Sequence, residues 1–278
     1  MKNLTKSDIK ILAKSNNISE REFLILLAEI VKSSYSKLFF ETEFNLSNHE
    51  FDKLLTYIER RSMSEPISKI LEKKEFYGIN FKTNQHTLDP RPETELIIDM
   101  FQKYYQDKNQ KLSILDLGSG TGCIGLSILS LYKNAMVDFV DISQNALNVA
   151  IQNSKNLEFF DRSKFILSNW FENITEKYDI IVSNPPYISD GFDLDAEVLY
   201  DPSIALFAGS KGMDAYNIII PNASNYLHDN GKLFLEIGFD QKQKILTLNN
   251  NLKVLEIAKD ISGIDRTFIF EKYNYLTS

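Results

Sequence analysis

The stretch Asn184-Pro185-Pro186-Tyr187 has the residue types most suited to chemistry in this chain. It follows the apolar run at 178–183, which predicts a buried strand, so it lies where that strand ends. Proline has no backbone N–H to donate, but its carbonyl oxygen can still accept a hydrogen bond. Together with the Asn184 side-chain oxygen, these carbonyls form an acceptor-rich notch that suits a planar –NH2 group, with the Tyr187 ring as a wall. An ordinary Asn-Pro turn is the alternative interpretation.

A second candidate site is the glycine-rich loop Asp116-Leu117-Gly118-Ser119-Gly120-Thr121-Gly122. Glycines allow a tight turn and a close approach of the backbone to a ligand, and the helix that follows offers unpaired N–H groups at its N-terminus. The next predicted strand ends at Asp141, which is positioned to accept hydrogen bonds from ribose hydroxyls. Because Gly120, Gly122 and Gly125 also fit the dinucleotide fingerprint, a dehydrogenase remains an alternative, as does a simple packing turn.

Alternating strands and helices must position these two sites. The predicted elements are strands at 112–116, 136–141, 165–168, 179–183 and 233–237, and helices near 122–132, 143–155 and 213–228. This alternation is typical of a mostly parallel sheet with helices on both faces, which makes the fold class α/β. We expect the tail to add an antiparallel pair, 253–259 and 267–272, at the sheet edge. Ligands of such sheets bind at the carboxyl ends of the strands, so the loop and the notch should face each other there.

The N-terminal part has a different pattern. Three segments begin with a hydroxyl residue followed three positions later by an acid, at Thr5, Ser19 and Ser47, and each precedes apolar residues at helical spacing. These capping-box signals predict a helical bundle over 1–74. A β-hairpin linker is expected at 75–88, followed by the α/β domain at 89–278. From its residue types alone, the string at 89–95 is interpreted as a proline-stiffened linker that also caps the following helix.

Composition limits the possible functions. The 278 residues are 43% hydrophobic and 25% charged, as in a soluble globular protein with room for two domains. Residues 1–88 have 14 Lys+Arg and 12 Asp+Glu, a net charge of +2, whereas residues 89–278 have 17 and 26, a net charge of −9. An acidic surface of this kind repels a phosphate backbone, so we expect no stable nucleic-acid binding.

Few residues are available for metal or disulfide chemistry. The chain has one cysteine, Cys123, and three scattered histidines, so we expect no disulfide, no metal site and a reducing, cytoplasmic location. The N-terminus is polar and no apolar run approaches a membrane span, so we expect no membrane association.

With these residues placed, the sequence resembles the HemK/PrmC family, the protein-(glutamine-N5) methyltransferases that act on peptide chain release factors. The resemblance covers nearly the whole chain, and the string at 89–95 separates this family from the DNA adenine methyltransferases that share the notch. The matching motifs are Glu75-Phe76-Tyr77-Gly78, Pro90-Arg91-Pro92-Glu93-Thr94-Glu95, Asp116–Gly122, Val140-Asp141-Ile142-Ser143, Ser183-Asn184-Pro185-Pro186-Tyr187-Ile188 and Leu235-Glu236-Ile237-Gly238.

The resemblance implies a helical substrate-recognition domain joined to a class I, Rossmann-like domain that uses S-adenosyl-L-methionine. It implies that Asn184, Pro185 and Tyr187 act in catalysis and that Pro186, Arg91 and Glu93 join them in binding the substrate. The implied cofactor-binding residues are Asp116, Gly118, Ser119, Gly120, Thr121, Gly122, Asp141, Trp170 and Asn184. The chain departs from the family pattern at Asn169 and Asp201, where the family has an acid and a glutamate.

The implied reaction is methylation of the glutamine in the Gly-Gly-Gln motif of class 1 peptide chain release factors, which supports translation termination. An adenine-N6 methyltransferase acting on DNA or RNA is the enzymatic alternative. A binding module that retains an inert fold is the non-catalytic one.

Overall fold

The computed structural model describes residues 1–248 and 251–273. Contacts between residues divide the chain into two compact units, and each is described by itself. The first consists of residues 1–73 and 194–200, and the second of residues 74–193 and 201–278.

The first unit is mainly helical. Its helices are α1 (Lys6–Ser15), α2 (Glu20–Ile30), α3 (Tyr35–Phe40), α4 (Asn48–Ser62) and α5 (Ile67–Leu71). All three predicted capping boxes are confirmed, with Thr5, Ser19 and Ser47 each accepting from the backbone N–H three residues later. The apolar faces of these helices meet in one core around Phe23, which is fully buried.

Two features of this unit were not predicted. The strands β1 (Lys2–Thr5) and β2 (Glu43–Leu46) form a two-stranded antiparallel sheet. Each has only four residues, so even the alternation of exposed and buried side chains in β2 is too short to stand out in the sequence. The segment 194–200 joins the unit from far along the chain, where Arg61 binds both Glu22 and Glu197.

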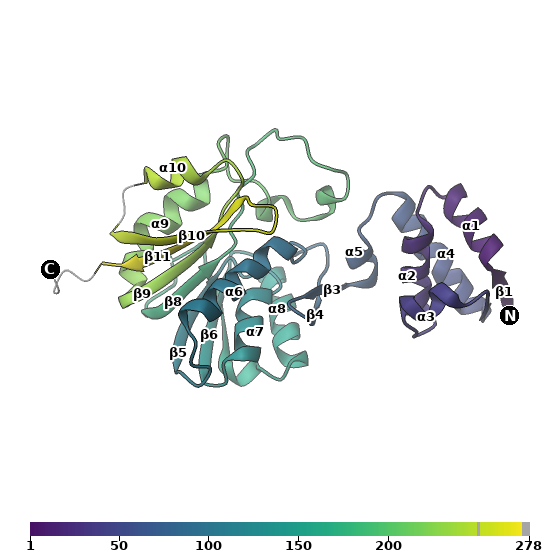
Figure 1. Cartoon of the computed structure of the whole chain (residues 1–278), viewed down its shortest axis with the longest axis horizontal. Coiled ribbons are helices and arrows are strands. Elements are labelled where there is room, and N and C mark those ends of the chain that lie inside the picture. Colours follow the sequence, from purple (N-terminus) through teal and green to yellow (C-terminus); the bar gives the residue numbers. More distant parts are fainter. Residues whose placement is uncertain (249–250, 274–278) are drawn as a thin grey trace. The chain divides into compact units, whose positions relative to one another are not determined.

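The second unit contains a seven-stranded sheet with helices on both faces (Figure 1). Its strands are β5 (Leu112–Leu117), β6 (Ala135–Asp141), β7 (Ser163–Leu167), β8 (Tyr178–Ser183), β9 (Leu227–Glu236), β10 (Leu252–Lys259) and β11 (Asp265–Lys272). The spatial order is β10-β11-β9-β8-β5-β6-β7, and the strands from β9 to β7 run parallel. The predicted antiparallel tail is confirmed, since β10 pairs with β11 and lies at the edge.

Alternate side chains of β5 enter opposite cores, as the two-residue period of a strand requires. Ile114 packs on one face with α6 (Glu95–Tyr104) and α7 (Cys123–Leu131). Leu115 packs on the other face with α9 (Asp214–Tyr226). The remaining helices of this unit are α8 (Gln144–Asn156) and α10 (Lys242–Leu246). The strands are therefore buried on both faces, which is typical of parallel sheets.

The predicted hairpin also forms, from β3 (Lys73–Phe76) and β4 (Ile79–Lys82). Asn153 of α8 connects it to the glycine loop, because its side-chain amide donates to the carbonyls of Lys82 and Thr121 and its oxygen accepts from the Lys82 N–H. Among the described residues, no helix is both long enough and apolar enough to cross a membrane.

Candidate active site

The glycine loop and the notch leave two adjacent strands at the same sheet edge. β5 and β8 pair in parallel, with Asp116 opposite Val182. One residue further on, the Ser183 hydroxyl donates to the Leu117 carbonyl at 2.7 Å and ties the two strand ends together. The order of the strands reverses between β5 and β8, so this is the switch point at which such sheets bind ligands.

Asp141 holds the glycine loop in place. Its Oδ2 accepts from the Gly120 N–H and its Oδ1 from the Ser143 N–H, both at 2.9 Å. The N–H groups of Gly118 and Ser119 donate to the Val140 carbonyl at 2.9 and 2.8 Å. Burial raises the pKa of Asp141, and the backbone N–H groups of Ser143, Gly120 and Ile142 oppose the shift. Each carboxylate oxygen keeps acceptor capacity for a diol such as a ribose.

Asp116 lies beneath the loop, away from the cavity described below. Its Oδ2 accepts from the Gly125 N–H at 2.9 Å, and its Oδ1 has no hydrogen-bond partner among the described residues. Burial raises the pKa of Asp116 to about 7. Gly125 is needed for packing, since a Cβ there would lie 2.5 Å from Phe139 Cε1.

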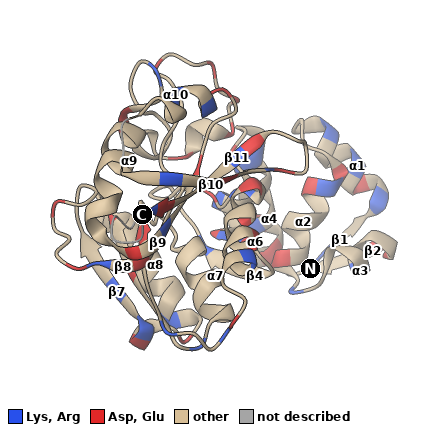
Figure 2. Ribbon diagram, turned by 60° about the vertical axis from the view of Figure 1, so that its left-hand side comes forward, with Lys and Arg blue, Asp and Glu red and all other residues tan. Residues whose placement is uncertain are grey.

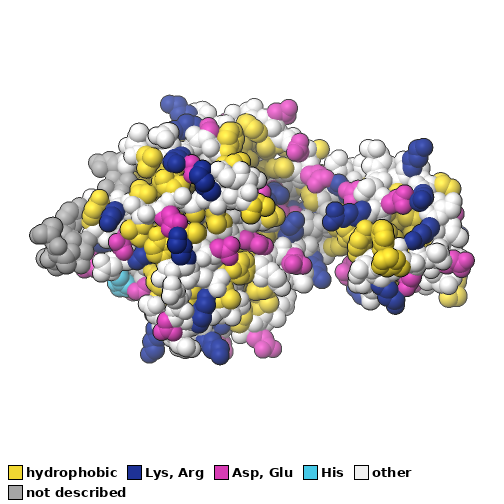
Figure 3. Space-filling view, in the orientation of Figure 1, with side chains coloured by type: hydrophobic (Ala, Val, Ile, Leu, Met, Phe, Trp, Pro, Cys, Tyr) yellow, Lys and Arg dark blue, Asp and Glu magenta, His cyan; other side chains and the backbone are white. Residues whose placement is uncertain are grey.

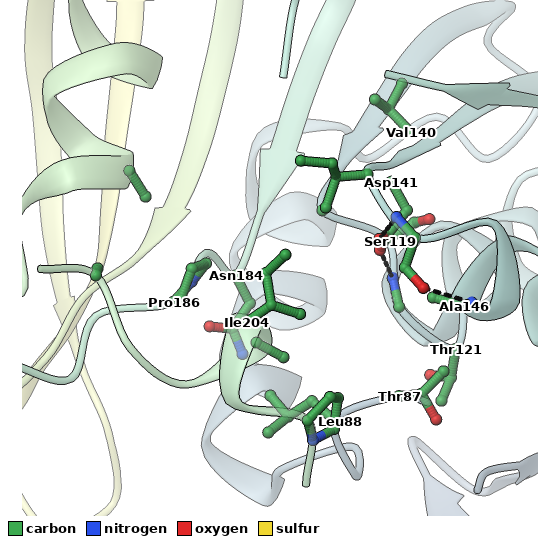
Figure 4. A pocket seen from close by; sticks show the side chains of 18 of the residues that line it. Thr87, Leu88, Ser119, Thr121, Val140, Asp141, Ala146, Asn184, Pro186 and Ile204 are labelled. Atoms are coloured by element: carbon green, nitrogen blue, oxygen red, sulfur yellow. Dashed lines mark hydrogen bonds between the residues drawn. The ribbon is translucent and has the colours of Figure 1, made fainter. Parts of the chain in front are cut away.

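A cavity of about 320 Å³ lies between the loop and the notch. Figure 4 shows Ser119, Thr121 and Asp141 on one side of it and Asn184 with Pro186 on the other. Of the predicted site residues, the cavity brings together Arg91, Gly118, Ser119, Gly120, Thr121, Asp141, Trp170, Asn184 and Pro186. The predicted residues outside its lining are Glu93, Asp116, Gly122, Pro185 and Tyr187.

Trp170 covers the start of the loop. Its ring carbon Cζ3 lies 3.5 Å from where a Cβ of Gly118 would be, so the glycine allows the indole to pack close to the backbone. Trp170 itself has a φ of 50°, which is uncommon for a bulky side chain. Its neighbour Asn169 also lines the cavity, and its amide donates to Glu172 at 2.7 Å, which leaves the Asn169 oxygen as an acceptor.

The notch holds a free acceptor. The Asn184 Nδ2 donates to the Thr94 hydroxyl oxygen at 2.9 Å, while the Asn184 Oδ1 is buried without a hydrogen-bond partner among the described residues. A buried carbonyl oxygen without a partner is unfavourable, and a donor from a ligand would remove that penalty.

A buried carboxylate lies behind the notch. Glu236, at the end of β9, accepts a long hydrogen bond of 3.4 Å from the Tyr187 hydroxyl. Burial raises the pKa of Glu236 to about 7, while hydrogen bonding by Thr94 and Tyr187 and the charge of Arg266 oppose the shift. The Tyr187 carbonyl in turn accepts from the Gln241 side chain at 2.7 Å, which fixes the backbone after the two prolines.

The string at 89–95 contributes Asp89, Pro90, Arg91 and Thr94 to the lining of the cavity. Arg91 forms an ion pair with the buried carboxylate of Asp201, whose other oxygen accepts from the Asp89 N–H at 3.1 Å. The one-methylene-shorter Asp201 therefore still reaches Arg91. A 3-10 turn at Pro92–Thr94 buries Thr94 and leaves Glu93 exposed.

Several residues at the cavity were not among the predicted ones. His86, Leu88 and Ile204 line it, and Glu236 lies behind it. Glu236 has a signal in the sequence, because it is an acid within the apolar run Leu233–Ile237. His86 has no such signal in the sequence, since only the folding of the linker brings it to the cavity. Cys123 also lines the cavity as a free thiol, and burial raises its pKa to about 12.

The residues present fit S-adenosyl-L-methionine. The glycine at 120 has no atom within 4 Å of where its Cβ would be, so a ligand has room beside it. The Ser119 hydroxyl is buried without a partner among the described residues and can bind a polar group of a ligand. Asp141 supplies the acceptors for a diol, and Trp170 supplies a flat apolar wall.

Comparisons with known proteins agree with this geometry. Residues 87–263 match the family model of the methyltransferase small domain. The release factor glutamine methyltransferase of Agrobacterium fabrum is 35% identical, and the match covers 89% of this chain and 89% of that protein. That of Buchnera aphidicola is 37% identical, over 96% of this chain and 97% of that protein.

Other relatives are longer or more distant. The bifunctional methyltransferase of Rickettsia typhi is 37% identical over 93% of this chain, which spans about half (54%) of its length. A methyltransferase crystal structure from Pyrococcus furiosus shares the fold, with a TM-score of 0.53, 15% identity, and coverage of 82% of this chain and all (100%) of that one. This chain therefore belongs to the HemK/PrmC family of release factor glutamine methyltransferases, with a methyltransferase small domain at 87–263.

Proposed function

We propose that this protein transfers a methyl group from S-adenosyl-L-methionine to the side-chain amide nitrogen of the glutamine in the Gly-Gly-Gln motif of class 1 release factors. The observation that carries the proposal is the free, buried Oδ1 of Asn184 at the wall of the glycine-loop cavity. Membership of the family supports the choice of a release factor as the substrate. The reaction belongs to translation termination and hence to the cytoplasm.

The two sides of the cavity have separate tasks in this proposal. Asp141 binds the ribose of the cofactor, and Trp170 flanks the adenine. The backbone of the loop from Gly118 to Gly122 surrounds the cofactor. When bound, S-adenosyl-L-methionine supplies an electrophilic methyl carbon and becomes S-adenosyl-L-homocysteine. The notch at 184–187 holds the substrate amide, and Arg91 and Glu93 bind the surrounding peptide.

An amide nitrogen is a poor nucleophile because its lone pair is delocalised into the carbonyl group. The Asn184 Oδ1 and the Pro185 carbonyl would accept its two hydrogens, enrich the nitrogen and fix its orientation. The nitrogen then forms a bond to the methyl carbon as the carbon–sulfur bond breaks, and its extra proton leaves to water. Well-oriented reactions gain roughly 7–11 kcal/mol from such positioning.

The helical unit at 1–74 is proposed as the substrate-recognition domain and the hairpin at 75–88 as its linker. The notch alone does not distinguish glutamine from adenine, because both present a planar –NH2 group. Figure 2 marks Lys and Arg positions interspersed with Asp and Glu positions along the ribbon, and Figure 3 shows the two kinds of side chain interspersed over the face in view. This mixed surface, with the net charge of −9 over 89–278, favours a protein substrate over a nucleic acid.

The test is mass spectrometry of recombinant class 1 release factor after incubation with the protein and S-adenosyl-L-methionine. We expect a mass increase of one methylene on the glutamine of the Gly-Gly-Gln motif. DNA and RNA serve as parallel substrates. An unmodified release factor would refute the proposal, and methylated adenine in the parallel samples would establish the alternative.

A further inference from the structure

The backbone of the notch at 184–187 has few groups with which to bond to its neighbours. Pro185 and Pro186 have no N–H to donate, so neither can bond to an adjacent strand through that group. In the proposed function the Pro185 carbonyl is reserved for the substrate amide. The orientation of the notch therefore depends on the groups that bond to its two ends.

Gln241 bonds to the Tyr187 end of the notch. It lies at the start of α10, and it is only 2% exposed. Its Nε2 donates to the Tyr187 carbonyl at 2.7 Å and to the Gly212 carbonyl at 2.8 Å. Its Oε1 accepts from the Gly238 N–H at 2.9 Å. Because a carbonyl can only accept and a backbone N–H can only donate, these partners fix which end of the amide is the nitrogen.

Two glycines make room for this amide. Gly212 has a φ of 64°, and a Cβ there would collide with the Tyr187 carbonyl oxygen and lie 2.8 Å from Gln241 Nε2. A Cβ on Gly238 would lie 2.7 Å from Gln241 Oε1 and 3.3 Å from the Tyr187 ring carbon Cδ2. A side chain at either position would thus displace Gln241 or Tyr187. This close packing explains the glycine in the motif at 235–238, which the proposed function leaves without a role.

The hydrogen bonds of Gln241 join the notch to a wall of the cavity. Gly212 lies in the turn before α9, and Asp214 at the start of that helix lines the cavity. Beyond Tyr187, the Ile188 carbonyl accepts from the N–H of Ala208, another lining residue, at 2.9 Å. A shift of the Gln241 amide would therefore loosen the end of the notch from the segment that faces it.

We propose that Gln241 is a positioning residue for the methyl transfer, which holds the backbone at Tyr187 so that the Pro185 carbonyl and the Tyr187 ring face the substrate amide. The carbonyl is the more closely held end of Tyr187, since its hydroxyl donates to Glu236 only at 3.4 Å. Gln241 is not among the residues that line the cavity, so it acts through Tyr187. The kinetic consequence rests on the proposed function, whereas the hydrogen bonds are a property of the protein alone.

The first test compares two substitutions of Gln241. Gln241→Glu keeps the size and an acceptor for Gly238 but replaces the donor group with an oxygen, and Gln241→Met removes the hydrogen bonds without adding charge. We expect both to lower kcat by about 10- to 100-fold, with the Kd for S-adenosyl-L-homocysteine within about threefold of wild type. Gln243→Glu is the matched control, because it makes the same charge change at an exposed position of the same helix, and its kcat should stay near the wild-type value.

Two results of this test would overturn the proposal. One is a wild-type kcat in Gln241→Met. The other is an equal loss of kcat and of affinity for S-adenosyl-L-homocysteine, which would indicate general damage to the fold and not a misplaced notch. Thermal melting confirms that each variant is folded at the assay temperature.

A second measurement, by NMR, needs no substrate. With carbonyl-carbon-13 tyrosine and nitrogen-15 isoleucine, the chain gives one-bond signals only from the pairs Tyr57–Ile58 and Tyr187–Ile188. We expect the Tyr187–Ile188 signal to shift in both Gln241 variants, and the Tyr57–Ile58 signal to stay in place. An unmoved Tyr187–Ile188 signal would refute the hold of Gln241 on the notch.

The wild type alone supplies a third measurement. Both hydrogens of the Gln241 side-chain NH2 should be protected from exchange with solvent, because each is donated to a carbonyl. Fast exchange would contradict the proposal even if the variants of Gln241 did not fold. If the wild type left the release factor unmodified, the proposed function would fail, and the two NMR measurements would still decide whether Gln241 holds the notch.

Discussion

The two sides of the cavity each have a buried carboxylate behind them, and the two carboxylates are held differently. Asp116 lies under the glycine loop and accepts from a backbone N–H of α7 at 2.9 Å, whereas Glu236 lies behind the notch and accepts from the Tyr187 hydroxyl at 3.4 Å. Burial raises the pKa of both groups to about 7. A backbone N–H cannot reverse its direction, but a hydroxyl can. The glycine loop is therefore supported by a short hydrogen bond to a fixed backbone donor, while the carboxylate behind the notch has one long hydrogen bond to a side chain.

The comparison also separates binding from transfer. In the proposed function, Asp141 and the loop bind the cofactor, and Asn184 binds the substrate amide. Variants on the two sides should consequently fail in different measurements, and the following predictions test that separation in order of decreasing effect.

Asn184→Ala should have the largest effect. Removal of the free acceptor should lower kcat by about 10³-fold, by analogy with the loss of a preorganised hydrogen-bonding group from a reaction centre. The Kd for S-adenosyl-L-methionine, measured by calorimetry, should change by less than about threefold. Asn222→Ala is the matched control, because Asn222 lies on α9 and its side-chain amide donates to the Ile218 carbonyl of the same helix. Near wild-type turnover in Asn184→Ala would remove the basis for an acceptor role.

Asp116→Asn should change the pH dependence of stability and leave the pH dependence of kcat intact. A carboxyl whose folded pKa of about 7 exceeds its unfolded value stabilises the protein at low pH, and this contribution is lost as the pH rises from about 4 to about 7. The free energy of unfolding should thus decline less in the variant over this range, by on the order of 2–4 kcal/mol.

The measurement is denaturant unfolding at about pH 5 and about pH 8 for the wild type and Asp116→Asn. Asparagine can still accept from the Gly125 N–H, so helix α7 should keep its start. A changed kcat–pH profile in Asp116→Asn would contradict a purely structural role for Asp116.

Asp141→Asn should weaken cofactor binding by about 10- to 100-fold, because two backbone donors now face one oxygen and one –NH2 group. At saturating cofactor, kcat should remain near the wild-type value. Calorimetry gives the Kd, and the exposed Asp161→Asn serves as the control. A lower kcat with an unchanged Kd would contradict the role of Asp141 in cofactor binding.

Asn169→Asp should have the smallest effect, less than about threefold on the Kd for S-adenosyl-L-methionine. The variant restores the acid of the family pattern, but Glu172 lies next to it and repels a second negative charge. Adding Glu172→Gln should relieve the repulsion and tighten binding relative to Asn169→Asp alone. Equal Kd values for the single and double variants would exclude repulsion by Glu172 as the reason for the small effect of Asn169→Asp.

Much of the fold follows from the sequence because its signals are local. The strand at 178–183 is a continuous apolar run, and the capping boxes at Thr5, Ser19 and Ser47 each lie within four residues. The loop, Asp141 and Asn184 follow from those elements because parallel strands end at one edge. The contacts of Thr94, Glu236 and His86 do not follow, since they depend on how a linker and a distant strand fold against the notch.

The third glycine of the dinucleotide fingerprint, Gly125 on α7, shows how a motif can mislead. At Gly125, a Cβ would collide with Phe139 at 2.5 Å and lie 2.9 Å from Asp116 Oδ2, so the position is limited by helix-to-sheet spacing and not by a ligand. The dinucleotide fingerprint counts this glycine as evidence for one cofactor. An α/β enzyme whose first helix packs this closely on its sheet needs a glycine at this position, whichever ligand it binds. The glycine pattern shared by dehydrogenases and methyltransferases therefore reflects in part a common distance between helix and sheet.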